Sequence, residues 1–178
     1  MLSRLRGRVR RGPLLLGVLV VAVVSGMAVF ALGARPSVEV LNAVPVKAAY
    51  VGTTYAFDGL VCVGSQVTTT RVTGVEVEPV QGVRTQVVRA PAGEPPTVGF
   101  PVNPGGAEPV DGLEIPAGEP DCGFRLLVTP EQTGQLAVSD LRISTTYGPG
   151  GLLRRTLEAT PQLTLDVTGT GPDPRSSS

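Results

Sequence analysis

The chain carries two kinds of hydrophobic pattern, a continuous apolar run near its start and short alternating segments after residue 34. Between Leu14 and Leu32 no residue is charged, and Ser25 carries the single polar side chain. A helix rises about 1.5 Å per residue, so this run would be roughly 28 Å long, close to the hydrocarbon thickness of a bilayer. The pattern therefore predicts a transmembrane helix over residues 14–33, in direct contact with the lipid bilayer.

The charges that flank this run predict its orientation. After the run, the nearest cations are Arg35 and Lys47. Before it stand five arginines with no acidic residue among them: Arg4, Arg6, Arg8, Arg10 and Arg11. Because positively charged flanks stay on the cytoplasmic side, we expect residues 1–13 in the cytoplasm and the remainder outside a single-pass cell-membrane protein.

A cleaved, exported protein is the alternative to a membrane anchor. Ala31, Leu32 and Gly33 are small or apolar residues that resemble the end of a signal peptide. Cleavage near Gly33-Ala34 would release a secreted, soluble domain.

After residue 34, apolar and polar residues alternate with a period of two, which is typical of half-buried strands. Valine and threonine are abundant and turn residues separate the segments. The predicted strands cover residues 37–46, 55–64, 66–73, 74–80, 83–90, 122–130, 136–147, 152–159 and 162–169, where 66–73 and 74–80 are either two strands or one strand broken near Gly74. The "GPGG" loop between 136–147 and 152–159 predicts a hairpin. These strands predict a mostly β fold, an immunoglobulin-like β-sandwich over residues 37–168, with a small closed β-barrel as the alternative.

Residues 91–121 interrupt this pattern with a segment rich in proline and glycine. Connections in a compact domain are commonly about 4–6 residues long, so this segment is expected to be a long surface loop. It is either an insertion without a partner or a contact site for an envelope or membrane protein. The apolar residues expected to make that contact are Phe100, Val102, Leu113 and Ile115. The last residues, 169–178, are expected to be disordered.

Cys62 and Cys122 are the only cysteines. In an oxidising compartment, two cysteines in one small domain are most simply a structural disulfide. A redox pair usually has the C-x-x-C spacing, which is absent here. The two cysteines are therefore expected to be bonded, on facing strands.

Composition and charge exclude several kinds of chemistry. The chain has no histidine, which excludes His-ligated zinc and triads that use imidazole. It also lacks the G-x-S-x-G elbow and the glycine-rich phosphate-binding motifs. Residues 34–178 contain ten basic and fifteen acidic residues, a net charge near −5 that disfavours nucleic acid.

The carboxylates are interpreted as solvated groups. Glu76 and Glu78 lie two residues apart on one predicted strand face, with nothing nearby to raise one pKa selectively. A second acidic group lacks the Asp-x-Asp-x-Asp-Gly spacing of a calcium loop; it comprises Glu108, Asp111, Glu114, Glu119 and Asp121. No catalytic residue, cofactor, metal site or small-molecule substrate is predicted, although an enzyme with a scattered carboxylate-based site stays as an alternative.

The layout resembles that of membrane-anchored or exported β-domain proteins of high-GC Gram-positive bacteria. The resemblance is carried by the arginine-rich start, the apolar span, "DGLVCVGS" leading to "VTGVEVEPV", and "DCGFRLLV" leading to "LRISTTYGPGGLLRRTLEA". It implies an extracytoplasmic β-domain in which Cys62 and Cys122 are paired, and it carries over no catalytic residue. The function expected from these patterns is a membrane-anchored binding or structural module of the cell envelope and not an enzyme.

Overall fold

The computed structural model describes residues 12–41, 45–105, 107–138 and 140–171, without the side chains of residues 12–18, 29, 31–33 and 170. The chain divides into two units, Met1–Gly33 and Ala34–Ser178. The five arginines of the predicted cytoplasmic tail, Arg4 to Arg11, lie outside the described residues, as do residues 172–178 of the predicted disordered tail.

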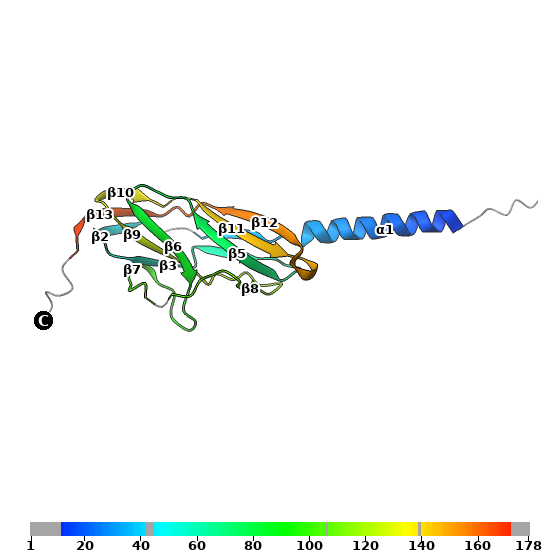
Figure 1. The fold of residues 1–178 in the computed structure, drawn as a ribbon, viewed down its shortest axis with the longest axis horizontal. Coiled ribbons are helices and arrows are strands. Elements are labelled where there is room, and N and C mark those ends of the chain that lie inside the picture. The colour runs from blue at the N-terminus through cyan, green and yellow to red at the C-terminus, as the bar shows by residue number, and fades with distance from the viewer. Residues whose placement is uncertain (1–11, 42–44, 106, 139, 172–178) are drawn as a thin grey trace, which may run out of the picture. The chain divides into compact units, whose positions relative to one another are not determined.

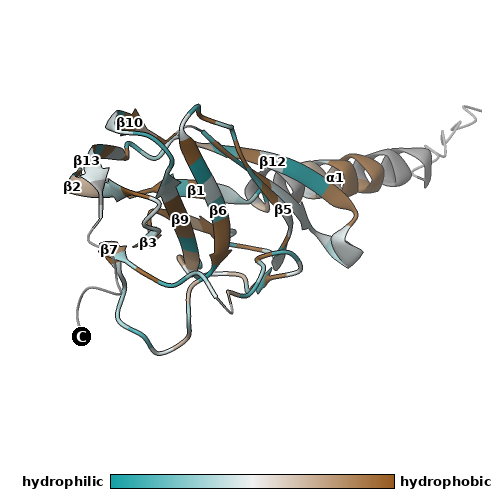
Figure 2. Cartoon of the chain, turned by 60° about the vertical axis from the view of Figure 1, so that its left-hand side comes forward, coloured by the Kyte–Doolittle hydropathy of each residue, from teal (hydrophilic) through white to brown (hydrophobic). Residues whose placement is uncertain are grey.

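The first unit contains helix α1 (Gly12–Gly33). Its bounds agree with the helix predicted over residues 14–33, and Pro13 lies in the first turn, where a missing N–H is tolerated. Figure 2 shows hydrophobic residues along this helix. Judged on the residues that the structure describes, no helix is both long and apolar enough to cross a membrane. The transmembrane span therefore stays a prediction.

The second unit is built from strands, as predicted (Figure 1). Their bounds are β1 (Ser37–Val40), β2 (Val46–Val51), β3 (Tyr55–Asp58), β4 (Val61–Gly64), β5 (Thr70–Val77), β6 (Val83–Arg89), β7 (Val98–Pro101), β8 (Glu114–Ile115), β9 (Phe124–Pro130), β10 (Gly134–Ala137), β11 (Leu141–Tyr147), β12 (Leu153–Ala159) and β13 (Thr164–Thr170). A short 3-10 helix, η1 (Pro149–Gly151), connects β11 to β12.

The described strands form four open sheets. Sheet 1 has the order β6-β9-β3-β7 and sheet 2 the order β12-β11-β5-β8, all antiparallel. Two smaller sheets pair β1 with β4 and join β10, β13 and β2. Within the latter, β13 runs parallel to β2.

Sheets 1 and 2 share one hydrophobic core, as expected for a β-sandwich. Phe57 and Leu126 of sheet 1 and Leu141 and Ile143 of sheet 2 are all buried, and together they line one small apolar hollow. Each such side chain contributes about 1.5–3 kcal/mol by leaving water. The alternation predicted for residues 162–169 is confirmed, since Leu163, Leu165 and Val167 are buried.

Several predicted strands are divided in the structure. The predicted strand 37–46 becomes β1 and β2, which join different sheets, and 55–64 divides at Gly59, whose φ of 69° bends the chain. Residues 136–147 divide into β10 and β11. At the other end, β13 extends to Thr170 because Gly169 and Thr170 pair with β2, so the predicted tail at 169–178 begins too early.

The Pro/Gly segment 91–121 is part of the scaffold, which corrects the prediction of a plain surface loop. Its strands β7 and β8 add to sheet 1 and sheet 2 respectively. Val110 and Ile115 belong to the core, and Leu113 packs against it. The segment also covers the outer face of sheet 1, where Val102 packs on Leu127 and its buried neighbours. For this reason Leu127 is buried, although alternation along β9 places it on the same face as the charged Arg125.

The predicted disulfide between Cys62 and Cys122 is confirmed. Its predicted placement on two facing strands is wrong. Cys62 is buried in β4, whereas Cys122 is exposed and lies just before β9, next to the bridge between Val63 and Asp121. The Cα atoms are 4.1 Å apart because the two segments are neighbours in one layer. The bond thus fixes the exit of the 91–121 segment to the edge of the sandwich.

Candidate functional site

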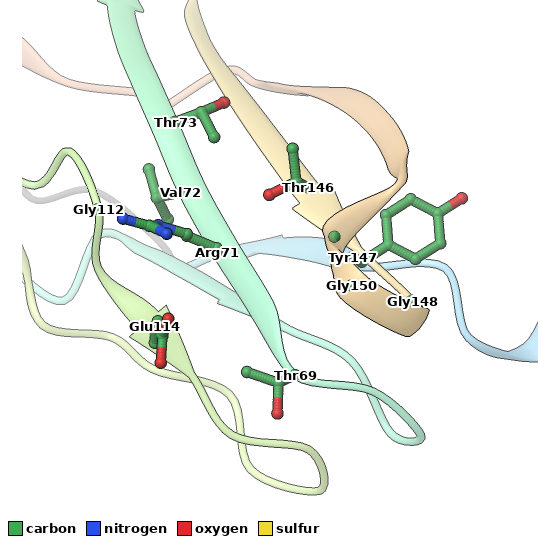
Figure 3. Close-up of a pocket in the computed structure, with 11 residues that line it drawn as sticks. Thr69, Arg71, Val72, Thr73, Gly112, Glu114, Thr146, Tyr147, Gly148 and Gly150 are labelled. Carbon is green, nitrogen blue, oxygen red and sulfur yellow. The ribbon is translucent and has the colours of Figure 1, made fainter.

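A groove of about 640 Å³ lies at one end of sheet 2 (Figure 3). Its walls come from β5, from the turn that precedes β8, and from the end of β11 with the loop that follows it. The lining is mostly polar or glycine: Thr69, Arg71, Val72, Thr73, Gly112, Glu114, Thr146, Tyr147, Gly148, Gly150 and Gly151. The groove is open to solvent, so it is suited to a surface ligand and not to an enclosed small molecule.

The register of sheet 2 places a row of polar side chains at this groove. Arg71 is paired with Glu114 on one side and with Thr146 on the other, and Thr146 is paired in turn with Arg154. Residues opposite each other on neighbouring strands share one face of the sheet. The outer face therefore presents Glu114, Arg71, Thr146 and Arg154 in order across its four strands.

The loop after β11 shapes one wall of the groove. Gly148, Gly150 and Gly151 all have positive φ, of 77°, 64° and 67°, which allows the tight turn "GPGG" between β11 and β12. The hairpin predicted at this sequence is confirmed. Without side chains, these glycines leave their backbone groups accessible to a ligand.

Arg71 is the charged donor of the groove. It is exposed, and no ion pair in the described part of the chain joins it to Glu114. Gly112 lies beside its guanidinium, since a Cβ at this position would be 3.6 Å from Arg71 Nη2, an ordinary van der Waals contact. A guanidinium with neighbouring hydroxyls is suited to binding a carboxylate or another oxygen-rich group.

A buried ion pair lies in sheet 1 and was missed by the sequence analysis. Arg125 Nε and Nη2 donate to the Asp58 carboxylate at 2.6 and 2.8 Å. The same carboxylate accepts from the Thr97 N–H at 2.7 Å, and Glu94 lies 3.7 Å from Arg125 Nη2. The hydrogen bond from Arg125 to Asp58 raises the pKa of Arg125, although burial lowers it. The available signal was a lone charge inside each of two apolar runs, "YAFDGL" and "GFRLLV".

This ion pair is structural, because its groups bind one another and the 91–121 segment. Asp58 N also donates to Thr97 O at 2.7 Å. A hollow of about 340 Å³ lies beside it, lined in part by Arg125, Glu94 and Asn103. Since both carboxylate oxygens are already occupied, the pair offers no free acid or base for catalysis.

The structure does not bring the four predicted contact residues of the 91–121 segment to one surface. Phe100 is 66 % exposed on β7. Val102 and Leu113 are partly buried against the two clusters of the domain, and Ile115 is fully buried. Of the four, only Phe100 is free to contact a partner.

The acidic residues of this segment also stay apart. Within the described ranges, no group of three or more His, Cys, Asp or Glu side chains is placed to hold a metal ion. Asp121 Oδ1 instead accepts from the Gly123 N–H at 2.6 Å, closing a local turn before β9. Glu76 and Glu78, interpreted as solvated carboxylates, are exposed.

No protein-family model matches the sequence, and no curated protein matches it. Among solved structures, the chain is similar to the N-terminal domain of PorA. The two share 14 % sequence identity over 77 % of this chain and 100 % of that chain, with a TM-score of 0.31.

Proposed function

We propose that this protein is a membrane-anchored, extracytoplasmic binding module of the cell envelope, with an immunoglobulin-like domain and no catalytic role. The observation that carries the binding role is the polar groove around Arg71 on the outer face of sheet 2.

The strand order supports an immunoglobulin-like sandwich. Constant-type immunoglobulin domains place four strands in the order A-B-E-D on one sheet and C, F and G on the other. Here β1 pairs with β4, which continues β3 along the chain. Strand β3 pairs with β9, and β9 pairs with β6, so these strands follow the order β1, β3 with β4, β9, β6. On the other sheet, β5, β11 and β12 are neighbours in that order. The disulfide differs from the immunoglobulin one, since it does not join the two sheets.

The sequence of α1 supports the anchor. Residues 14–32 are uncharged and follow five arginines, which favours an orientation with residues 34–178 outside. The described large apolar side chains of the helix, among them Leu19, Val24 and Met27, are exposed. A lipid environment would bury them.

The chemistry of the groove favours a carboxylate or hydroxyl-rich group, such as an acidic peptide segment of another envelope protein. Arg71 supplies a fixed positive charge, and Thr69 and Thr146 supply hydroxyls beside it. Glu114 pairs with Arg71 across strands β5 and β8. Its negative charge would repel the ligand's carboxylate and so direct that carboxylate to the side of Arg71 away from Glu114.

Site-directed photo-crosslinking in intact cells tests this role. A crosslinker at Thr73, beside the groove, is expected to capture a discrete partner, whereas one at exposed Gln86 of β6 serves as the control position. Arg71→Ala should reduce the Thr73 adduct about tenfold, since a charge-assisted hydrogen bond is lost. Arg84→Ala, which removes an exposed arginine outside the groove, should not. Equal yields from Thr73 and Gln86, or no effect of Arg71→Ala, would contradict the proposal.

A cleaved and secreted form is the alternative, and the mature N-terminus distinguishes the two. The anchored protein begins before the apolar run and fractionates with membranes. A chain that begins at Ala34 and is recovered from the medium would establish the secreted form.

A further inference from the structure

One end of the domain, here called the anchor end, gathers segments that are distant in the sequence. It comprises Ala34, the loop 65–69, the turn 116–119 and the hairpin loop 148–152. The Ala34 carbonyl accepts from Ser65 Oγ at 3.0 Å and from Thr68 Oγ1 at 3.1 Å. Gly118 N donates to Ser65 O at 2.9 Å, which joins the turn to the same loop.

Strand register places the hairpin loop at this end. Thr70, two residues after Thr68, pairs with Tyr147, which pairs with Leu153. The residues between Tyr147 and Leu153 therefore lie beyond the first residue of β5. Figure 3 shows Thr69, Gly148 and Gly150 around one end of the groove.

Apolar side chains are exposed at the anchor end. Leu152 is 83 % exposed at the tip of the hairpin loop, and Val67 is 48 % exposed in the loop 65–69. Leu153, which follows Leu152, is 38 % exposed. The hairpin loop carries no charge, since its sequence is "GPGGL".

The anchor end is also where the domain follows α1 in the chain. The chain leaves α1 at Gly33, and the next residue, Ala34, is already buried and held by the two hydroxyls. Pro36 is also buried, and its carbonyl accepts from Arg155 Nη1 at 2.9 Å. Ala34 and Pro36 are therefore fixed parts of the anchor end, one and three residues after the helix.

We propose that the anchor end docks on the lipid bilayer, with Leu152 inserted into the interfacial region and Val67 beside it. This inference rests on the proposed anchoring by α1. Lipid is the occupant because the helix and the docked face are consecutive in the chain. Apolar side chains at a membrane surface are buried at the boundary between headgroups and acyl chains, as the apolar face of an interfacial helix is. Glu119, exposed on the turn 116–119, would stay at the level of the headgroups.

Single-tryptophan variants of the full chain test this docking, because the protein has no tryptophan. Leu152→Trp reports on the anchor end. Phe100→Trp is the matched control, since Phe100 is also exposed but pairs with Ala56, nine residues before Ser65. Residues 55–65 pair continuously with residues 118–128, so the chain keeps one direction between Ala56 and Ser65. At about 3.3 Å per residue, the control position therefore lies about 30 Å from Ser65 at the anchor end.

Both variants are reconstituted in phosphatidylcholine vesicles, with and without brominated acyl chains that quench nearby tryptophan. Leu152→Trp emission is expected to shift to the blue and to fall about twofold in the brominated vesicles, because the side chain reaches the acyl boundary. Phe100→Trp emission should not change.

Sedimentation of the same vesicles distinguishes failure of the α1 anchor from failure of the docking. If both variants sediment with lipid but neither is quenched, the docking is overturned while the anchor stands. If both remain in the supernatant, the anchor fails and the docking fails with it. Equal quenching of both variants would also overturn the proposal, because it would not be specific to the anchor end.

Discussion

Two buried polar residues, Thr70 and Asp58, differ in whether their polar atoms are paired. Asp58 accepts hydrogen bonds from Arg125 and from the Thr97 N–H. Thr70 is fully buried, and its Oγ1 is without a hydrogen-bond partner among the described residues. Burying an unpaired hydroxyl costs free energy, and removing one partner of a buried ion pair is costly because it leaves the other charge uncompensated.

Thr70→Val is expected to stabilise the protein. The substitution keeps the β-branched shape in strand β5 and removes the unpaired hydroxyl, so the free energy of unfolding should rise by about 1 kcal/mol. Urea denaturation of the full chain in mild detergent measures this change. Thr73→Val is the control, because Thr73 is exposed and its Oγ1 donates to Ser144 O at 3.2 Å. A Thr70 variant that unfolds at lower urea than the parent would show that the hydroxyl is satisfied.

Asp58→Asn is expected to destabilise the protein. It removes the charge that pairs with the largely buried Arg125 guanidinium, leaving only the exposed Glu94 at 3.7 Å, and should cost about 3 kcal/mol. Arg84→Gln breaks an exposed pair with Glu131 at 3.9 Å and should cost less than about 1 kcal/mol. Similar losses for the two variants in urea denaturation would refute a special role for the buried pair.

The pKa of Arg125 is raised by its hydrogen bond to Asp58, and this determines how the stability contributed by the pair depends on pH. A basic group whose pKa is higher in the folded state contributes its stability in full below its ordinary pKa, and loses it only as pH rises through the folded value. Deprotonation of Arg125 therefore does not weaken the domain at neutral or mildly alkaline pH.

At the scale of elements, the 91–121 segment behaves as part of both sheets. β7 pairs with β3, and β8 pairs with β5. Val110 and Ile115 are part of the hydrophobic core. Thr97 N–H donates to Asp58, and Glu94 lies beside Arg125, so the ion pair also binds this segment. Loss of this segment would expose edges and apolar surface in both sheets at once.

Replacing residues 93–119 with a short Gly/Ser linker is therefore expected to unfold the domain or to destabilise it by several kcal/mol, since buried side chains such as Ile115 each contribute about 1.5–3 kcal/mol. Protease resistance of the purified full chain checks this outcome. Phe100→Ser, which changes an exposed side chain of the same segment, should leave resistance unchanged. A linker variant as resistant as the parent would show that the segment is only an insertion.

At the scale of the whole molecule, the arrangement of charge around the apolar run is expected to set the topology. Replacing Arg4, Arg6, Arg8, Arg10 and Arg11 with asparagine removes the positive flank that stays in the cytoplasm. The fraction of molecules whose residues 34–178 are digested by protease added outside spheroplasts should fall. Replacing Lys47, Arg84, Arg89, Arg142 and Arg154 in the same way is the control and should leave that fraction unchanged, because all five are exposed. Full external digestion of the first variant would show that the arginines do not orient the chain.

The sequence by itself was enough for features that depend on local chemistry. An uncharged run of aliphatic residues predicted the helix that ends at Gly33, and alternation with a period of two predicted most strands, including β6, β9 and β12. The "GPGG" turn and the Cys62–Cys122 bond followed from turn residues and from the cysteine count. These signals are readable because each depends on residues close in the chain or on residue types that occur only once or twice.

Only the tertiary structure decided what depends on neighbours from distant segments. The burial of Leu127 and Ile115, which a period of two or a loop-like composition does not show, follows from the segment 91–121 joining both sheets. The Asp58–Arg125 pair joins residues 67 positions apart. The groove needs three strands in register to bring Arg71 between Glu114 and Thr146. Long-range pairing of this kind is fixed by which faces the whole domain buries, and no short stretch of sequence contains that information.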